Sequence, residues 1–333
     1  MLRSTIRVLA TLGLAGATAL AAAQAKKELT FAHQDMLVPL RLVMESGEVE
    51  KATGYKINWR MFSGGGDVIR AMASGDIQMG ETGSSPLTAA ASQGQDIKLF
   101  WISADIADAE ALVARNGSGV NAIKDLKGKR VGVTFVSTAH YQLMAALKAA
   151  GLGSKDVNVM NMRPPEIAAA WERGDIDATF VWDPVLTKVK ANGKVIATSG
   201  SIGKQGFPTF EGIVVNSKWA AENEAFMVAF AKALERANEE VRKGLKGWNA
   251  DSPQIKAIAK WTKANPAEVQ AGMSLYTFPT LQEQLSATWL GGGAAKAMAN
   301  TAAFLKEQGR IQEVKPSYAP FVTDVYVRKA LGK

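Results

Sequence analysis

The chain has 333 residues, 39 basic and 31 acidic side chains, a formal charge of +8 and no cysteine. The missing cysteines exclude disulfides, thiolate zinc sites, iron–sulfur clusters and cysteine nucleophiles, and only two histidines, His33 and His140, argue against a histidine-rich metal site. With 47% hydrophobic and 21% charged residues, wholesale disorder is excluded, and this length normally gives two lobes or domains.

The first 25 residues predict an export signal. Arg3 and Arg7 give a positive start, residues 8–23 are uncharged and apolar, and Ala23-Gln24-Ala25 matches a cleavage site. The apolar stretch is short for a membrane span. We therefore expect an exported protein cleaved near Ala25. Losing the two arginines lowers its formal charge to +6, and the remaining basic residues are scattered without interleaved aromatics, which argues against a nucleic-acid partner.

An internal repeat predicts the architecture. Residues 67–77 (DVIRAMASGDI) and 166–176 (EIAAAWERGDI) each have the pattern of an amphipathic helix that ends at glycine and leads through Asp-Ile into a short strand. Upstream, residues 29–33 and 130–135 read as strands that each precede a helix. Alternating strands and helices in both halves predict two similar α/β lobes with parallel sheets.

Two extended stretches, residues 110–114 and 211–215, are expected to carry the chain between the lobes. A two-stranded connection of this kind is a hinge that can close on a ligand. The C-terminal third, from Ser217, is mostly helical in pattern and should pack on the first lobe. The expected division is a signal peptide at 1–25, lobe 1 at 26–112 and 213–333, and lobe 2 at 113–212.

Two helix starts at matching places in the two lobes predict an anion site. Gly83-Ser84-Ser85-Pro86 follows one predicted strand, with Ser84 as the expected N-cap, and Ser137 or Thr138 caps the helix after another. Ligands of open α/β sheets bind at such strand ends, where helix N-termini offer free N–H groups. Each motif alone is also an ordinary helix start, so the pairing carries the prediction.

Further polar and aromatic residues follow strands or flank the crossings. Gln34 follows the first strand, Trp182 and Asp183 precede a helix, and Glu110 and Glu211 begin the two crossing stretches. Each of these residues also has a purely structural interpretation. Gln34 could be a solvated loop amide, Asp183 a helix cap, and Glu110 a partner in a hinge salt bridge.

An enzyme is the weaker interpretation. Ser137 and His140 are three residues apart, but there is no G-x-S-x-G elbow, and that spacing is more typical of a cap and a packed side chain. Gly64-Gly65-Gly66 lacks a nucleotide-binding frame and reads as a turn leading into a helix. No loop bunches carboxylates for a metal. We expect no catalytic residues, metal or cofactor.

Several motifs resemble the periplasmic taurine-binding proteins of ABC importers, in the group that binds aliphatic sulfonates, nitrate and taurine. They include GSSPL at 83–87, FVSTAHY at 135–141, PPEIAAAW at 164–171 and GDID at 174–177. The resemblance runs from the signal segment to Val322-Thr323-Asp324, so it covers almost the whole chain. It implies the type II periplasmic-binding fold, two α/β lobes joined by a two-stranded hinge.

The resemblance also implies a ligand and a set of contacts. A sulfonate would take helix-end N–H groups and hydroxyls, and an ammonium would meet Glu211, where the relatives carry aspartate. An aromatic ring, Trp182 or Tyr141, would cover the stem. The candidate ligand-binding residues are Gln34, Ser84, Ser85, Glu110, Ser137, Thr138, His140, Tyr141, Trp182, Asp183 and Glu211.

The expected function is capture of taurine in the periplasm and delivery to an ABC transporter permease, by a monomer that meets the membrane only through that permease. Within the same class, an alkanesulfonate or nitrate binder is the alternative. Outside it, the alternatives are a periplasmic enzyme and a ligand-sensing partner of a receptor.

Overall fold

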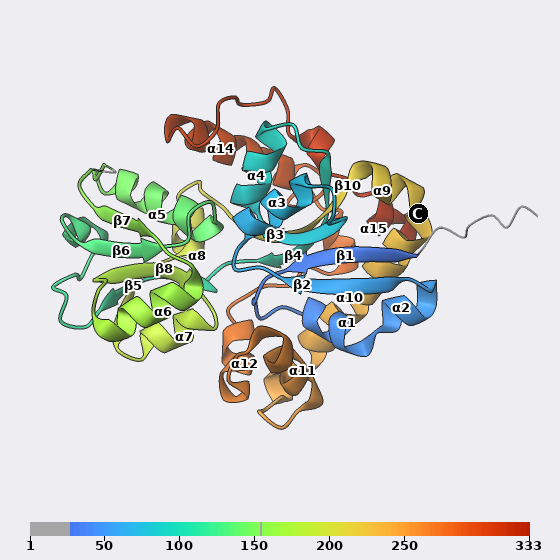
Figure 1. Ribbon diagram of the computed structural model, residues 1–333, viewed down its shortest axis with the longest axis horizontal. Helices are drawn as coiled ribbons and strands as arrows, with labels where there is room; N and C mark the ends of the chain where they lie inside the picture. The colour runs from blue at the N-terminus through green and yellow to red at the C-terminus, as the bar shows by residue number, and fades with distance from the viewer. Residues whose placement is uncertain (1–26, 154) are drawn as a thin grey trace, which may run out of the picture.

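The computed structural model describes residues 27–153 and 155–333, so the expected signal peptide at 1–25 lies outside the described residues. The described chain forms two α/β lobes, each built on a five-stranded sheet (Figure 1). The first sheet has the order β2-β1-β3-β10-β4. Its strands are β1 (Glu28–His33), β2 (Lys56–Met61), β3 (Met79–Gly83), β4 (Ile97–Asp105) and β10 (Phe210–Asn216).

The second sheet has the order β7-β6-β8-β5-β9. Its strands are β5 (Glu110–Arg115), β6 (Arg130–Val133), β7 (Asn158–Asn161), β8 (Ala178–Trp182) and β9 (Gly193–Thr198). We call the part of the chain on the first sheet the first lobe and the part on the second sheet the second lobe.

Each sheet is parallel except around one strand. β1 pairs in parallel with β2 and β3, and β6 with β7 and β8, whereas β10 is antiparallel to β3 and β4, and β5 is antiparallel to β8 and β9. The expectation of parallel sheets therefore misses one antiparallel strand per lobe. These two strands enter from the opposite lobe, which reverses their direction.

The same two strands correct the position of the crossings. Residues 110–114 and 211–215 were expected to connect the lobes, but they lie in β5 and β10, each hydrogen-bonded within one sheet. The chain passes between the sheets just before them, at 106–109 and between β9 and β10. The lobe division drawn at 112/113 and 212/213 falls inside these strands and stays a prediction.

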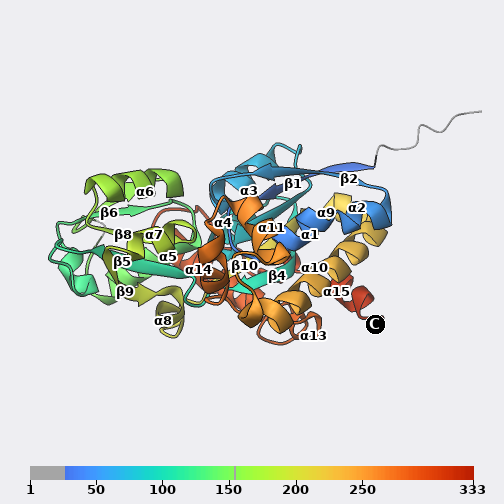
Figure 2. The same ribbon diagram turned by 90° about the horizontal axis from the view of Figure 1, so that it is seen from below.

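Helices cover both faces of each sheet (Figures 1 and 2). Those between the strands of the first sheet are α1 (Leu40–Ser46), α2 (Glu48–Thr53), α3 (Gly65–Ala73) and α4 (Ser84–Ser92). Those of the second lobe are α5 (Thr138–Ala149), α6 (Pro164–Arg173), α7 (Val185–Lys190) and α8 (Ser199–Gly203). Short 3₁₀ turns occupy Ile123–Leu126, Leu245–Gly247 and Ala319–Phe321.

The C-terminal third is helical, as expected. Its helices are α9 (Ser217–Glu222), α10 (Glu224–Gly244), α11 (Pro253–Thr262), α12 (Pro266–Met273), α13 (Leu281–Gln284), α14 (Gly293–Glu307) and α15 (Val325–Ala330). Phe230 of α10 packs against Phe31 of β1 and Phe100 of β4, with ring centroids 5.7 Å and 6.4 Å away. This aromatic core fixes the C-terminal third on the first sheet.

The internal repeat corresponds to α3–β3 in the first lobe and α6–β8 in the second. α6 ends at Gly174, whose φ of 78° lies in the left-handed region that favours glycine. In α3 the C-cap is Ser74 and the left-handed residue is the following Gly75, with φ 87°. Between residues 27 and 333, Ser154 excepted, no helix combines the length and apolar character of a membrane span.

Candidate functional site

A narrow cavity, with a volume of about 10 Å³, lies between the lobes, where strands of both sheets end. Six of the candidates chosen from sequence line it: Gln34, Glu110, Ser137, Thr138, Trp182 and Glu211. The other lining residues are Met36, Gly65, Gly83 and Pro86.

Three helices begin at this cavity. Gly65 is the first residue of α3, Gly83 is the N-cap of α4, and Ser137 is the N-cap of α5. The first N–H groups of a helix have no partner within it, and the helix dipole places partial positive charge there. The cavity therefore offers N–H groups suited to an anion, from helices of both lobes.

The structure adjusts how these helices start. The Ser137 hydroxyl accepts a hydrogen bond from the His140 N–H at 3.0 Å, so Ser137 is the predicted cap of α5. The expected cap role of Ser84 is wrong, because Gly83 is the N-cap of α4. The start of α3 was missed as part of the site, although three consecutive glycines marked it in the sequence.

Gly83 lies at a close approach between the lobes. A Cβ atom built on it would lie 2.6 Å from Cγ2 of Thr138 and 3.2 Å from Oε2 of Glu211. Its backbone angles, φ −70° and ψ 160°, are open to any residue. Glycine is thus required here for space and not for conformation.

Two buried carboxyl groups also line the cavity, one from each lobe, next to the starts of α4 and α5. Glu211 of β10 accepts a hydrogen bond at Oε1 from Nε2 of Gln34 at 2.8 Å. Glu110 of β5 accepts from the Thr138 hydroxyl at 2.5 Å and from the Ser199 hydroxyl at 3.1 Å. Both side chains belong to residues only 2% exposed.

Burial disfavours the charged form of both groups, and negative neighbours add to this effect at Glu211. Burial raises the pKa of Glu110 to about 7, against the opposing effect of the hydrogen bonds from Thr138 and Ser199. The pKa of Glu211 is raised well above its ordinary range, first by burial and then by the negative charges of Glu81 and Glu110. The pair therefore favours either a proton or an external cation.

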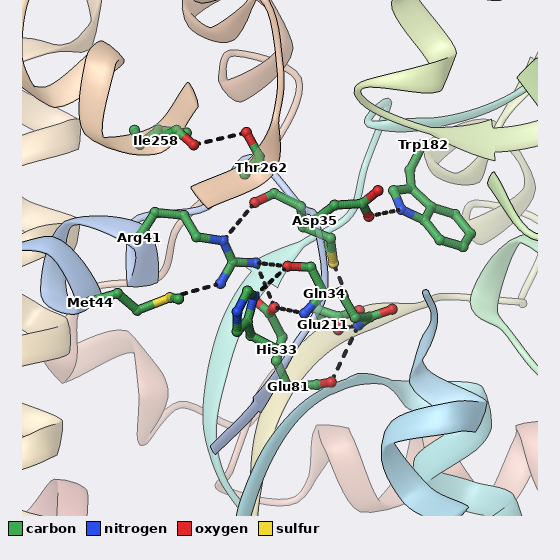
Figure 3. Close-up of polar contacts among 11 residues, drawn as sticks. His33, Gln34, Asp35, Arg41, Met44, Glu81, Trp182, Glu211, Ile258 and Thr262 are labelled. Atoms are coloured by element: carbon green, nitrogen blue, oxygen red, sulfur yellow. Dashed lines mark hydrogen bonds and ion pairs between the residues drawn. The ribbon is translucent and has the colours of Figure 1, made fainter. Parts of the chain in front are cut away.

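A buried ion pair behind the cavity orients Gln34 (Figure 3). Nη2 of Arg41 lies 2.6 Å from Oε2 of Glu81, and neither side chain is exposed. Arg41 also donates to the Gln34 carbonyl at 2.9 Å, while the Gln34 N–H donates to Glu81 at 3.0 Å. With its backbone held on both sides, Gln34 directs its amide at Glu211.

Arg41 and Glu81 were not recognised from the sequence. The signals were a single arginine in the apolar run LRLVM at 40–44 and a glutamate in the middle of a strand that is buried throughout. Arg41 is already paired with Glu81. The described residues that line the cavity include two carboxylates and neither lysine nor arginine, so the lining itself offers no cationic side chain to Glu110 or Glu211.

Trp182 closes one side of the cavity and links the lobes. Its indole Nε1, on β8, donates to Oδ1 of Asp35, which follows β1, at 3.2 Å (Figure 3). Burial raises the pKa of Asp35, partly offset by this hydrogen bond. Asp35 was also missed from sequence, since its partner is 147 residues away.

The remaining five candidates lie outside the lining. Ser84 accepts from the Phe210 N–H at 3.3 Å, and Ser85 is buried in the first turn of α4. Tyr141 packs edge-on against Phe304 of α14, with ring centroids 5.2 Å apart.

His140 stacks on Phe135 at 4.4 Å, and burial together with the charge of Arg310 lowers its pKa to about 4. Asp183 accepts from the Thr187 N–H at 2.9 Å, as a cap of α7 would. Within 27–153 and 155–333, no group of three or more histidine, aspartate or glutamate side chains is placed to hold a metal ion.

Two α/β lobes joined by two crossings, with a small polar cavity between them, define the class of the type II periplasmic-binding fold. The family model described as NMT1/THI5 like matches residues 51–244, and the chain belongs to this family.

A curated relative, the taurine-binding periplasmic protein of Escherichia coli K12, is 36% identical over 90% of this chain and 92% of its own length. Among solved structures, the alkanesulfonate-binding protein SsuA from Xanthomonas axonopodis pv. citri, bound to MOPS, aligns with a TM-score of 0.72 at 22% identity. It covers 89% of this chain and 98% of that one. The desulfurization enzyme DSZB aligns with a TM-score of 0.64 at 16% identity. This alignment covers 92% of this chain and 99% of the DSZB chain. The last two similarities concern the fold alone.

Proposed function

We propose that this protein captures taurine, 2-aminoethanesulfonate, in the periplasm and delivers it to an ABC importer. The observation that carries the proposal is the polarity of the cavity. Three helix N-termini and the carboxyl groups of Glu110 and Glu211 line the same small cavity, with no lysine or arginine in the described lining. A small zwitterion with an anionic and a cationic end matches this arrangement.

The anionic end of taurine suits the helix starts. A sulfonate is charged at every physiological pH and donates no proton, so it needs donors only. Uncharged N–H groups at a helix start supply them without burying a second full charge, whose desolvation would be costly. The ammonium then pairs with the carboxylates by charge-assisted hydrogen bonds.

Binding without chemistry is supported by the polar groups themselves. The Ser137 hydroxyl donates to the Thr134 carbonyl at 2.6 Å and accepts from the His140 backbone, so it is engaged as a helix cap. The His140 ring stacks on Phe135 instead of facing that hydroxyl as a general base would. The proposed role ends with release of the intact ligand.

Export and delivery complete the proposal. Residues 1–25 direct the chain to the periplasm and are removed near Ala25, and the mature monomer presents its ligand to the membrane permease of the importer. The periplasmic relative at 36% identity supports this location.

A thermal-shift panel tests the ligand. The mature protein is heated in phosphate buffer, which contains no sulfonate, with taurine, propane-1-sulfonate, nitrate or β-alanine. A ligand present at 100 times its Kd stabilises by about 2.7 kcal/mol, so taurine should raise Tm most. A shift with β-alanine and none with either sulfonate would overturn the assignment, and a larger shift with nitrate or propane-1-sulfonate would support the alternative ligands.

A further inference from the structure

Glu110 and Glu211 occupy equivalent places in the two lobes. Each lies at the start of the strand that enters from the opposite lobe, β5 and β10 respectively. In its own sheet, Glu110 is paired with Trp182 at the end of β8, and Glu211 with Gly83 at the end of β3. The internal repeat thus brings two carboxyl groups into one cavity from opposite sides.

The hydrogen bonds of this pair leave its charge uncompensated. Glu211 receives the amide of Gln34, and Glu110 receives the hydroxyls of Thr138 and Ser199, all of them neutral donors. Two like charges in a buried site disfavour each other's ionisation. Closing the lobes over two ionised carboxylates therefore requires a positive charge between them, carried by a proton or a cation.

We propose that Glu110 and Glu211 form one cation subsite that holds a proton in the closed, ligand-free protein, and that the ligand's ammonium replaces this proton. The inference rests on the proposed function, because it needs a ligand with a cationic end. The ammonium enters, the proton leaves to solvent, and the net charge of the subsite is conserved. A sulfonate without an ammonium displaces no proton and gains nothing there.

Other ionisable groups around the pair do not supply the missing charge. Arg41 of α1 is paired with Glu81 of β3 at 2.6 Å, and its lowering effect on the pKa of Glu211 is smaller than the raising effect of Glu81. Tyr276, after α12, is a buried phenol whose pKa is raised well above its ordinary value by burial and by nearby carboxylates, so it stays neutral.

Two further carboxyl groups lie close by. Asp183, after β8, and Asp35, after β1, have pKa values raised by burial. The raised pKa values of Glu110 and Glu211 agree with a proton held near neutral pH.

Calorimetric titration in buffers of different ionisation enthalpy measures the proton directly. Taurine and its isostere propane-1-sulfonate, in which a methyl replaces the ammonium, are compared at pH 7 in phosphate, imidazole and Tris. We expect release of up to about one proton per taurine bound, none for propane-1-sulfonate, and a taurine affinity that rises with pH. Taurine binding without proton release would overturn this inference and leave the proposed function standing. Failure of taurine to bind at all would overturn the proposed function itself.

The variant Glu110→Gln removes the titrating group and keeps side-chain shape. It should abolish most of the proton release, weaken taurine by about 10-fold or more, and strengthen propane-1-sulfonate. The control Glu239→Gln removes an exposed carboxyl on α10 that is paired with Lys243, and should leave both affinities unchanged. Equal weakening of both ligands by Glu110→Gln would contradict the inference.

A second variant covers the case in which Glu110→Gln does not fold. Ser199→Ala removes one hydrogen bond that holds the pKa of Glu110 down, but retains the carboxyl group. Proton release on binding taurine should then shift to higher pH. An unchanged pH profile would count against Glu110 as part of the proton-holding pair.

Discussion

Nε2 of Gln34 lies 2.8 Å from Oε1 of Glu211, and this hydrogen bond joins the end of β1 to the start of β10 across 177 residues of sequence. It fixes one oxygen of the carboxylate. The other oxygen, Oε2, faces the close approach of Gly83 and Thr138. An amide donor next to a buried carboxylate favours its charged form, which is the form that binds an ammonium.

Replacing that amide tests its role. In Gln34→Leu the pKa of Glu211 should rise further, because the hydrogen bond that lowers it is gone. We expect taurine affinity to fall by about 5- to 10-fold, in line with roughly 1 kcal/mol for one hydrogen bond, and the loss to be greatest at low pH. Gln254→Leu, at an exposed amide bonded to Glu240, is the matched control in the same titration. Unchanged affinity in Gln34→Leu would show that Glu211 needs no orienting partner.

Gly83→Ala should hold the lobes apart. Its Cβ would meet Thr138 at 2.6 Å, far inside contact distance, while its backbone angles suit alanine. We expect at least about a 10-fold loss of ligand affinity and a larger radius of gyration by X-ray scattering with ligand, at nearly unchanged Tm. Gly64→Ala is the control, because its Cβ would lie 3.4 Å from Thr134, an ordinary contact. If Gly83→Ala with ligand has the same radius of gyration as the wild type with ligand, this account of closure is contradicted.

Variants of the Arg41–Glu81 pair distinguish its effect on folding stability from its effect on ligand binding. Arg41→Met leaves a fully buried carboxylate without its partner and should lower the free energy of unfolding by about 3–5 kcal/mol. The double variant Arg41→Met/Glu81→Leu removes both charges and should recover most of that loss in denaturant titrations. Taurine affinity should stay low in the double variant, since Gln34 loses both backbone contacts. Full recovery of affinity would show that the pair serves stability only.

His140 should make the protein less stable in acid. Its pKa falls from 6.5 to about 4 on folding, so the unfolded chain binds more protons in that window and stability is lost as pH drops from 6.5 to 4. The cost reaches roughly 3 kcal/mol at the low end, at 1.36 kcal/mol per pKa unit. His140→Phe should flatten this part of the stability profile measured by urea titration. If stability falls as steeply with pH in the variant as in the wild type, another group causes the acid sensitivity. His33, whose pKa is also lowered to about 4, is the next candidate.

Local signals predicted much of the fold and part of the site. The repeat at 67–77 and 166–176 indicated two similar lobes, and strand ends followed by helix caps located Gln34, Ser137, Thr138 and Trp182 at the cavity. These features depend on short-range physics, namely helix capping and the position of strand ends in an α/β sheet. The antiparallel direction of β5 and β10 was missed, because it depends on which lobe the chain enters from.

The remaining differences arise from side-chain direction and tertiary pairing. Thr138 faces the cavity, and successive residues of a helix turn by about 100°, so His140 and Tyr141 point elsewhere and pack on Phe135 and Phe304. Arg41 and Glu81, 40 residues apart, meet only after β1 and β3 have paired. No local pattern encodes such a contact.

One titration tests the central claim most directly: taurine and propane-1-sulfonate, each against the wild type and Glu211→Gln in sulfonate-free buffer. If Glu211 pairs with the ammonium, the substitution weakens taurine by about 10-fold or more and leaves propane-1-sulfonate unchanged or tighter. Equal losses for the two ligands would contradict the pairing and, with it, the assignment of the carboxyl groups in the cavity to a cationic ligand group.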